Sequence, residues 1–254
     1  MTNQEIATFL DAAAQQAKAV EQISIKNKFS LEEAYQIQRL SIKKREERGE
    51  KITGYKLGFT SYAKMEQMGV HDLIWGILTD KMIINSAEKV NLDRWIHPRA
   101  EPEIAFQVKE DISKPIELSE ISTYIDKMAV AIEVIDSRYK NFKFSLEDVV
   151  ADNCSSTGYV IGKWQDLDIK NIADLEISLK INDKIVEKGN SAAILDNPLQ
   201  SVVELSRLAS EAGLTVKKGQ VILAGAATAA VYLKNNDKIE SELENFGKVE
   251  FSVE

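Results

Sequence analysis

Three glutamates stand in a pattern that could bind a metal ion. Glu101 and Glu103 are separated by one residue, and Glu133 lies in an apolar run further along the chain. Residues i and i+2 of a β-strand point to the same face, so Glu101 and Glu103 can converge on one cation. An all-carboxylate site suits Mg²⁺ or Mn²⁺, because hard oxygen ligands disfavour soft metals. The alternative from spacing alone is a solvated strand edge, since charged side chains mostly lie on the surface.

A lysine and an aspartate are further candidates for catalysis. Lys56 stands between Gly54 and Gly58 in a segment that predicts a strand. It is either an edge residue or an inward-facing ammonium whose pKa burial would lower. Asp80 follows a glycine-interrupted apolar run and could orient the lysine or accept a proton. Its alternative role is to form a turn.

The histidines and the cysteine form no catalytic pattern. His71 and His97 stand in no nucleophile or zinc-type arrangement, and Cys154 has no paired histidine motif. Cys154 is therefore predicted to be a small buried residue rather than a nucleophile. A single cysteine also precludes an intramolecular disulfide.

Composition favours a small-molecule ligand. The chain has 254 residues, of which 44% are hydrophobic, and its formal net charge is −8. The acidic balance, with a pI near 5.1, argues against a nucleic-acid or anionic-membrane surface, because both need clustered positive charge. No apolar stretch approaches the length of a bilayer span or of a secretory signal. We therefore expect a cytoplasmic protein with neither nucleic acid nor membrane as a partner.

The elements that must position these residues begin with helices. Thr2 and Ser30 are each followed three residues later by glutamate, which predicts two capping boxes. Apolar residues then recur at helical spacing, and Leu31 is among those expected to face inward. Further helices are expected at about 61–68, 117–127, 145–150 and 199–212.

The carboxy-terminal stretch is strongly β. Residues 221–225, 229–233 and 238–244 predict strands, and a hairpin across the polar turn 235–237 fits this pattern best. Alternating apolar residues at 247–253 predict one further strand on a sheet packed on one face.

Strands and helices do not alternate regularly. We therefore expect an α+β protein rather than a doubly wound fold. Its helical amino-terminal part would cover residues 1–51, and a mixed, partly rolled sheet would cover residues 52–254.

Three motifs together carry a family resemblance. Gly54–Ser61, Pro98–Ala105 and Val149–Ser156, in this order and spacing, resemble the hydratase/decarboxylase branch of the fumarylacetoacetate hydrolase superfamily. The resemblance covers nearly the whole chain and implies a mixed β-roll. It also implies a divalent ion on the three glutamates and Lys56 as the active-site cation, with Asp80 as its partner. The implied substrate-binding residues are Thr60, Leu78, Ser155, Ser156 and Thr228.

Two activities compete within that branch. One is decarboxylation of 2-oxo-3-hexenedioate (4-oxalocrotonate), and the other is hydration of 2-hydroxypenta-2,4-dienoate, successive steps of aromatic meta-cleavage degradation. Residues 60–70, 133–144 and 228–231 are more similar to the decarboxylase pattern. Gly158 and residues 71–73 depart from it and leave the exact diacid open.

The resemblance also implies a homo-oligomer, and association of a decarboxylase with the hydratase. Other superfamily chemistry, such as C–C bond hydrolysis or oxaloacetate decarboxylation, stays an alternative. So does a catalytically silent structural subunit, although Lys56 and all three glutamates are intact.

The decarboxylation chemistry fits these ligands. In a 2-oxo-3-enedioate the distal carboxylate is a vinylogous β-keto acid, so loss of CO₂ pushes electrons through the alkene onto the ketone oxygen. A metal chelated by the α-keto acid would stabilise that charge. The protein therefore need not supply a nucleophile.

Overall fold

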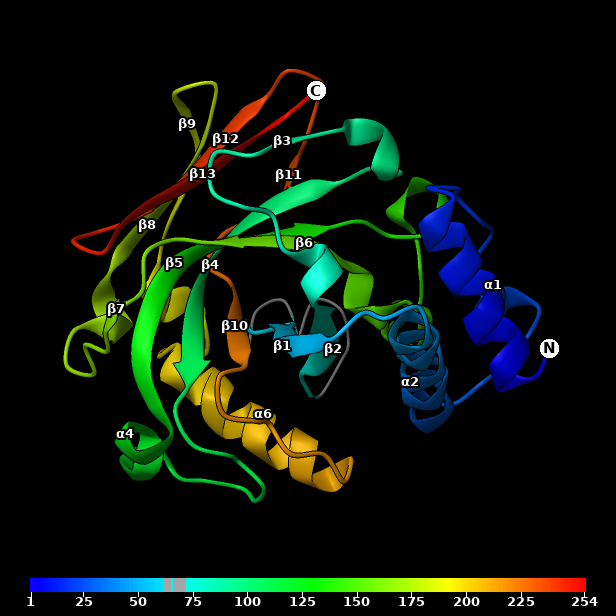
Figure 1. Cartoon of the computed structure of the whole chain (residues 1–254), viewed down its shortest axis with the longest axis horizontal. Coiled ribbons are helices and arrows are strands. Elements are labelled where there is room, and N and C mark those ends of the chain that lie inside the picture. The colour runs from blue at the N-terminus through cyan, green and yellow to red at the C-terminus, as the bar shows by residue number, and fades with distance from the viewer. Residues whose placement is uncertain (62–64, 66–71) are drawn as a thin grey trace.

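Two β-sheets pack against each other, with helices beside and beneath them (Figure 1). The structure is a computed structural model that describes residues 1–61, 65 and 72–254. Each sheet contains both parallel and antiparallel strand pairs, and some neighbouring strands are not consecutive in the chain. The amino-terminal part is helical. The predicted α+β class is confirmed.

The amino-terminal helices are α1 (Asn3–Gln15) and α2 (Leu31–Glu47). Thr2 and Ser30 cap them, and each forms the predicted capping box with the glutamate three residues on. The two helices lie side by side at one end of the molecule (Figure 1). Leu31 was expected to face inward and is 37% exposed, because it lines an open groove between α2 and residues 208–212.

The larger sheet carries the candidate residues. Its strands in the described part of the chain are β1 (Ile52–Gly58), β2 (Ile74–Thr79), β4 (Arg99–Val108), β5 (Ile125–Ile135), β6 (Ser156–Ile161), β7 (Gln165–Asp166), β10 (Val221–Ala226) and β11 (Val231–Tyr232). The order is β2-β1-β10-β4-β5-β6, with β11 beside β4 and β7 beside β5. Only the β1–β10 pair is parallel among these described pairs.

One face of this sheet gathers the candidate residues. The register places Lys56 opposite Leu223, Leu223 opposite Ala105, and Glu101 opposite Glu133. Because side chains alternate along a strand, all of these point to the same side. Deeper on that face an apolar cluster fills the space, made of Leu78, Met82, Ala105, Ala131, Tyr159 and Leu223.

The smaller sheet covers the other face of the larger one. Its strands are β3 (Lys89–Val90), β8 (Glu176–Ile181), β9 (Lys184–Asn190), β12 (Lys238–Leu243) and β13 (Gly247–Val253), in the order β3-β13-β12-β8-β9. The predicted one-sided pattern of β13 is confirmed, since Val249, Phe251 and Val253 are buried in the core between the sheets.

The predicted hairpin across residues 235–237 is wrong. β11 pairs with β4 in the larger sheet, whereas β12 pairs with β13 and β8 in the smaller one. The polar turn therefore leads the chain from one sheet to the other. The polar residues 235–237 predict the turn correctly. The partner of each flanking strand, however, depends on the apolar core against which that strand packs.

The helix expected at 117–127 is mostly absent. The segment contains a short 3-10 turn and α4 (Ile121–Tyr124), after which β5 begins. Residues from Ile125 onward are needed as a central strand, and this tertiary pairing overrides local helical preference. The other expected helices are present as α5 (Leu146–Ala151) and α6 (Leu199–Glu211), while 61–68 falls almost wholly outside the described residues.

The division between residues 1–51 and 52–254 stays a prediction. α1 and α2 share an apolar cluster with Ile74 of β2 and with Val149 and Val150 of α5. In the described part of the chain, no helix has the length and apolar character needed to cross a membrane.

Candidate metal and substrate site

The three glutamates converge in the structure. β4 carries Glu101 and Glu103 on one face, and Glu133 of β5 is the register partner of Glu101. One carboxylate oxygen from each residue lies within 4.8 Å of the other two. Glu103 and Glu133 are fully buried, so these two carboxylates are not on a solvated strand edge. The same-face convergence predicted from the spacing is confirmed.

This cluster fits a hard divalent cation. Glu103 Oε1 and Glu133 Oε1 are buried and have no hydrogen-bond partner among the described residues. Burial, with the charge of Glu133 next, raises the pKa of Glu103 well above its usual value although Lys56 opposes the shift. Burial also raises the pKa of Glu133 to about 7, against the lowering effect of Lys56. A metal ion stabilises buried carboxylates that repel one another and have oxygens without a hydrogen-bond donor. Oxygen ligands of this kind suit Mg²⁺ or Mn²⁺.

Glu103 is held in place by the backbone of β10. Gly225 N–H donates a 2.9 Å hydrogen bond to Glu103 Oε2. Gly225 has a φ of +109°, and a Cβ built there would lie 2.0 Å from Thr60 Oγ1. Only glycine combines this conformation with this close approach. The register shift between Leu223 and Ala226 marks the irregularity that turns the N–H toward the carboxylate.

Lys56 faces inward. It lies on β1, which is flanked by β2 and β10, and its residue surface is 4% exposed. Its Nζ lies 2.9 Å from Glu133 Oε2 and donates to the Cys154 carbonyl at 3.5 Å. Burial lowers the pKa of Lys56, but the charges of the three glutamates outweigh burial and raise it overall. The edge alternative is therefore wrong.

Asp80 does not meet Lys56, contrary to the expectation. Lys56 pairs with Gly76 in the β1–β2 register, whereas Asp80 follows Thr79, which pairs with Ile52. The Asp80 carboxylate accepts a 2.9 Å hydrogen bond from the Lys51 backbone N–H. It lines a separate cavity at the other end of the sheet. The turn-forming alternative describes it better, and Glu133 is the ionic partner of Lys56.

A left-handed turn closes one side of the site. Asn153, Cys154 and Ser155 have φ values of 51°, 53° and 59°, a region that residues other than glycine rarely occupy in succession. The Asn153 side chain accepts from Ile77 N–H at 2.8 Å and donates to the Ile77 carbonyl at 2.9 Å. These bonds fix the turn against β2 and aim the Cys154 carbonyl at Lys56.

Cys154 itself is structural, as predicted. It is buried, and its Sγ donates to the Trp75 carbonyl at 3.1 Å. Burial raises the pKa of the Cys154 thiol to about 12, so the sulfur stays protonated. His97 packs against the ring of Phe142 rather than entering the site, and His71 lies outside the described residues.

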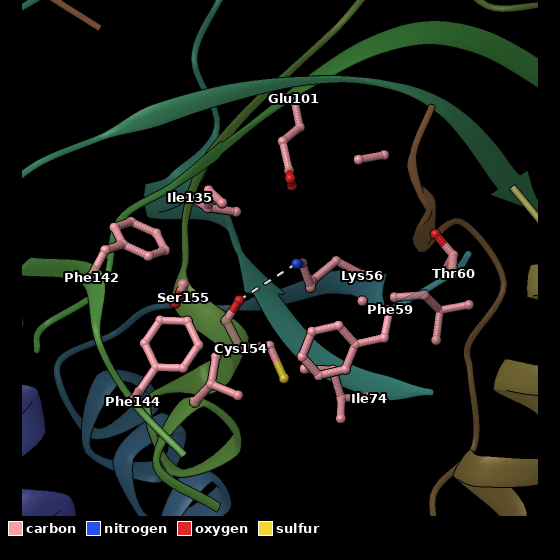
Figure 2. Close-up of a pocket in the computed structure, with 14 residues that line it drawn as sticks. Lys56, Phe59, Thr60, Ile74, Glu101, Ile135, Phe142, Phe144, Cys154 and Ser155 are labelled. Carbon is pink, nitrogen blue, oxygen red and sulfur yellow. Dashed lines mark hydrogen bonds between the residues drawn. The ribbon is translucent and has the colours of Figure 1, made fainter. Parts of the chain in front are cut away.

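Glu101 and Lys56 open onto a cavity of about 200 Å³. Figure 2 shows Glu101 pointing into it from one side and Lys56 reaching toward the Cys154 carbonyl from the other. Most of the remaining wall is apolar. It includes Phe59, Ile74, Ile135, Phe142, Phe144 and Val149. A small molecule with one polar end and one apolar stretch suits this space.

Two of the expected substrate-binding residues lie on this wall. Thr60 and Ser155 line the cavity, and the buried Ser155 Oγ has no hydrogen-bond partner among the described residues. Leu78 lies deeper, in the apolar cluster, and Ser156 Oγ faces Met82. Thr228 donates to the Ala229 carbonyl in the loop after β10. These three are not among the described residues that line the cavity.

Comparison with known proteins assigns the chain to a family. A family model described as fumarylacetoacetate (FAA) hydrolase C-terminal matches residues 65–254. The chain belongs to the fumarylacetoacetate hydrolase family. The site described above lies on β1, β4, β5 and β10 of this fumarylacetoacetate hydrolase fold, and all of these except β1 fall within the matched range.

The chain is similar to named decarboxylases and hydratases. A 4-oxalocrotonate decarboxylase of Pseudomonas sp. is 43% identical over 98% of this chain and 96% of its own. A 2-hydroxyhexa-2,4-dienoate hydratase of Comamonas testosteroni is 31% identical over 86% of this chain and 84% of its own.

A solved structure agrees over nearly the whole length. It is 4-oxalocrotonate decarboxylase from Pseudomonas putida G7, complexed with magnesium and adipate. Its TM-score is 0.96 at 34% identity, and the match covers 99% of this chain and 97% of that one. The mixed β-roll of the fumarylacetoacetate hydrolase type is therefore confirmed.

Sequence reasoning missed the aromatic wall and the backbone donor. Phe59, Phe142 and Phe144 line the cavity, yet Phe59 is far from the other two in sequence, and no periodic pattern links the three. Gly225 gave a weak signal, because a glycine inside a predicted strand often marks a bulge or a close backbone approach. The adjacent Asp152–Asn153 pair could have indicated left-handed backbone.

Proposed function

We propose that the protein decarboxylates 2-oxo-3-hexenedioate to 2-hydroxypenta-2,4-dienoate and CO₂ in the presence of Mg²⁺ or Mn²⁺. The observation that carries this proposal is the convergence of three carboxylates and Lys56 at one end of a small cavity with apolar walls. The 43% identity to a decarboxylase, against 31% to a hydratase, supports the same choice.

The polar end of the cavity would receive the keto acid. Glu101, Glu103 and Glu133 would hold the divalent ion, which supplies Lewis-acid chemistry to the keto acid when bound. Lys56 is placed to donate a hydrogen bond to the oxygen on which negative charge develops, or to return a proton to the carbon chain. The unpartnered Ser155 hydroxyl offers a further contact to the substrate.

The apolar wall favours loss of CO₂ over addition of water. Phe59, Phe142 and Phe144 surround the space beyond the polar end. These rings exclude water from the carbon chain next to the distal carboxylate, and the neutral CO₂ that forms suits this apolar space. Hydration would require an ordered water beside the same rings, where it would find few hydrogen-bond partners.

A product assay tests the proposal. The protein with Mg²⁺ is offered 2-oxo-3-hexenedioate and 2-hydroxypenta-2,4-dienoate separately, with EDTA-treated protein as the control. We expect CO₂ and the dienol from the diacid, loss of that activity with EDTA, and slow or absent hydration. Rapid conversion of the dienoate to 4-hydroxy-2-oxopentanoate with the diacid untouched would favour the hydratase instead. Inertness toward both would favour a silent structural subunit.

We also propose that the protein works in the cytoplasm as a homo-oligomer that associates with a dienoate hydratase. The family resemblance supports this proposal. Exposed apolar side chains on β9 add to it, since Ile185 and Val186 are 58% and 41% exposed. β9 lies at the edge of the smaller sheet, and apolar residues on such an edge are typical of protein contacts.

A further inference from the structure

An arginine packs against one wall of the cavity. Arg99 lies on β4 two residues before Glu101, so both side chains leave the same face of the strand. On one side its register partner is Ile135 of β5, which lines the cavity. On the other side its partner is Tyr232 of β11. Arg99 therefore lies beside the cavity wall, two residues along β4 from the carboxylate cluster.

Two aromatic rings clamp its guanidinium. The Cζ atom of Arg99 lies 3.9 Å from the ring centre of Phe142 and 4.1 Å from that of Tyr232. Arg99 Nη2 also donates to the Tyr232 hydroxyl. Two rings this close restrict the guanidinium and attract a cation without neutralising it. The edge that carries the N–H groups is then the remaining route for recognition.

The charge of Arg99 is uncompensated within the described residues. No carboxylate of residues 1–61, 65 or 72–254 lies within 4.0 Å of its nitrogens, and its buried Nε has no hydrogen-bond partner there. By contrast, Arg138, Arg48 and Arg207 all have carboxylate partners. A fixed, unpaired guanidinium beside a cavity is suited to bind a carboxylate in a bidentate manner.

We propose that Arg99 binds the distal carboxylate of the substrate and thereby selects a diacid over a monoacid. This inference rests on the proposed function, because it takes the three glutamates as the anchor for the keto acid end. Two residues of strand span about 7 Å, which is on the order of the length of a six-carbon chain. Phe142 lines the cavity and contacts Arg99. Its ring would therefore lie beside the carbon chain of the substrate, between the keto acid and the distal carboxylate.

Decarboxylation removes the carboxylate that Arg99 would bind. When the C5–C6 bond breaks, its electron pair moves into the carbon chain toward the keto oxygen, and C6 leaves as neutral CO₂. Arg99 thus binds the substrate more strongly than either product. An interaction made fully in the ground state affects KM more than kcat, so loss of Arg99 should act mainly on KM.

Paired ligands isolate this contact. 2-Oxoadipate and 2-oxohexanoate share the keto acid end and differ only in a terminal carboxylate or methyl group. Both are titrated calorimetrically into the Mg²⁺-loaded protein, Arg99→Gln and Arg99→Lys. We expect Arg99→Gln to weaken the binding of 2-oxoadipate by about 10- to 100-fold. The affinity for 2-oxohexanoate should be unchanged. Arg99→Lys keeps a positive charge on a side chain of similar length and should weaken the binding of 2-oxoadipate less than Arg99→Gln does.

Arg94→Gln is the matched control, because Arg94 also lies over an aromatic ring, that of Trp95, but lines a different cavity. It should leave the affinity for both ligands unchanged. Equal affinity of wild type and Arg99→Gln for 2-oxoadipate would overturn the proposal. So would equal weakening of both ligands, which would place the effect at the metal end. These titrations stay informative even if the diacid is bound but not decarboxylated, which would contradict only the proposed function.

Discussion

At the scale of single residues, the site is a problem of buried charge. When all three glutamates are ionised, they and the Lys56 ammonium carry two net negative charges in a space that Glu103, Glu133 and Lys56 share almost without solvent. One divalent ion neutralises that excess. Under the proposed function Lys56 would then be free to act on the substrate, because the ion would compensate the carboxylates in its place.

The first prediction concerns Lys56. Lys56→Met should bind Mn²⁺ with affinity close to that of the wild type but lower kcat by about 10²–10³, because an ammonium aimed at developing charge acts mainly in the transition state. Steady-state kinetics on the diacid and a Mn²⁺ titration measure the two effects. Lys127→Met, at an exposed lysine of β5 that pairs with Asp166, is the control. A wild-type kcat in Lys56→Met would remove Lys56 from the mechanism.

At the scale of elements, irregular backbone rather than regular strand orients the site. The register shift in β10 brings Gly225 N–H to Glu103, and the left-handed turn at 153–155 brings the Cys154 carbonyl to Lys56. The turn at 153–155 also stores conformational strain, which the surrounding pairing must hold. Rigid strands on either side supply that support.

The second prediction tests the β10 irregularity. Gly225→Ala should weaken Mg²⁺ binding by at least tenfold, because the new Cβ would clash with Thr60 and move the N–H away from Glu103. The matched control is Gly49→Ala, which has a similar φ of +92° but no atom within 4 Å of the new Cβ. Gly49→Ala should lose only about 1 kcal/mol of stability. Unchanged Mg²⁺ affinity in a folded Gly225→Ala would show that the N–H bond does not position Glu103.

At the scale of the whole molecule, the main core and the carboxylate cluster lie on opposite faces of the larger sheet. The smaller sheet packs on the larger one through the main apolar core, while its outer residues form ion pairs of their own. Glu240 of β12 accepts from Lys180 Nζ at 2.9 Å and from Lys248 Nζ at 2.6 Å. This network is on the opposite sheet from the carboxylate cluster, so it should act on folding alone.

The third prediction gives that network a pH dependence. Burial raises the pKa of Glu240, but the two lysines outweigh burial and lower it to about 2. A lowered folded pKa means that the stabilisation is complete above the ordinary value near 4.5 and is lost as the pH falls toward 2. Glu240→Gln should therefore reduce the free energy of unfolding by about 1–2 kcal/mol at pH 7, with kcat unchanged.

Urea unfolding of wild type and Glu240→Gln between pH 7 and pH 3 measures this difference, which should narrow below pH 4.5. Glu176→Gln is the control, since Glu176 and its partner Lys188 are both more than half exposed and such pairs contribute little. A difference that stays constant over this pH range would mean that the ionised form of Glu240 is not what stabilises the sheet.

Local sequence signals determined much of the fold and part of the site. Thr2 and Ser30 predicted the starts of their helices correctly, because all residues of a capping box lie within a four-residue segment. The spacing of Glu101 and Glu103 determined that they share a face because side chains alternate along any strand. The class of fold and the anchor of the site therefore followed from interactions between near neighbours.

Only the tertiary structure decided which distant residues meet. Asp80 could pair with Lys56 chemically, yet the β1–β2 register places it at the other end of the sheet. Glu133 of β5 forms the ion pair with Lys56 instead. The hairpin failed for the same reason, because β11 and β12 each pair with a strand far away in sequence. Likewise, Phe142 and Tyr232 reach Arg99 only when β4, β11 and the segment after β5 are assembled. Strand register is set by the packing of a shared core, and no local pattern encodes it.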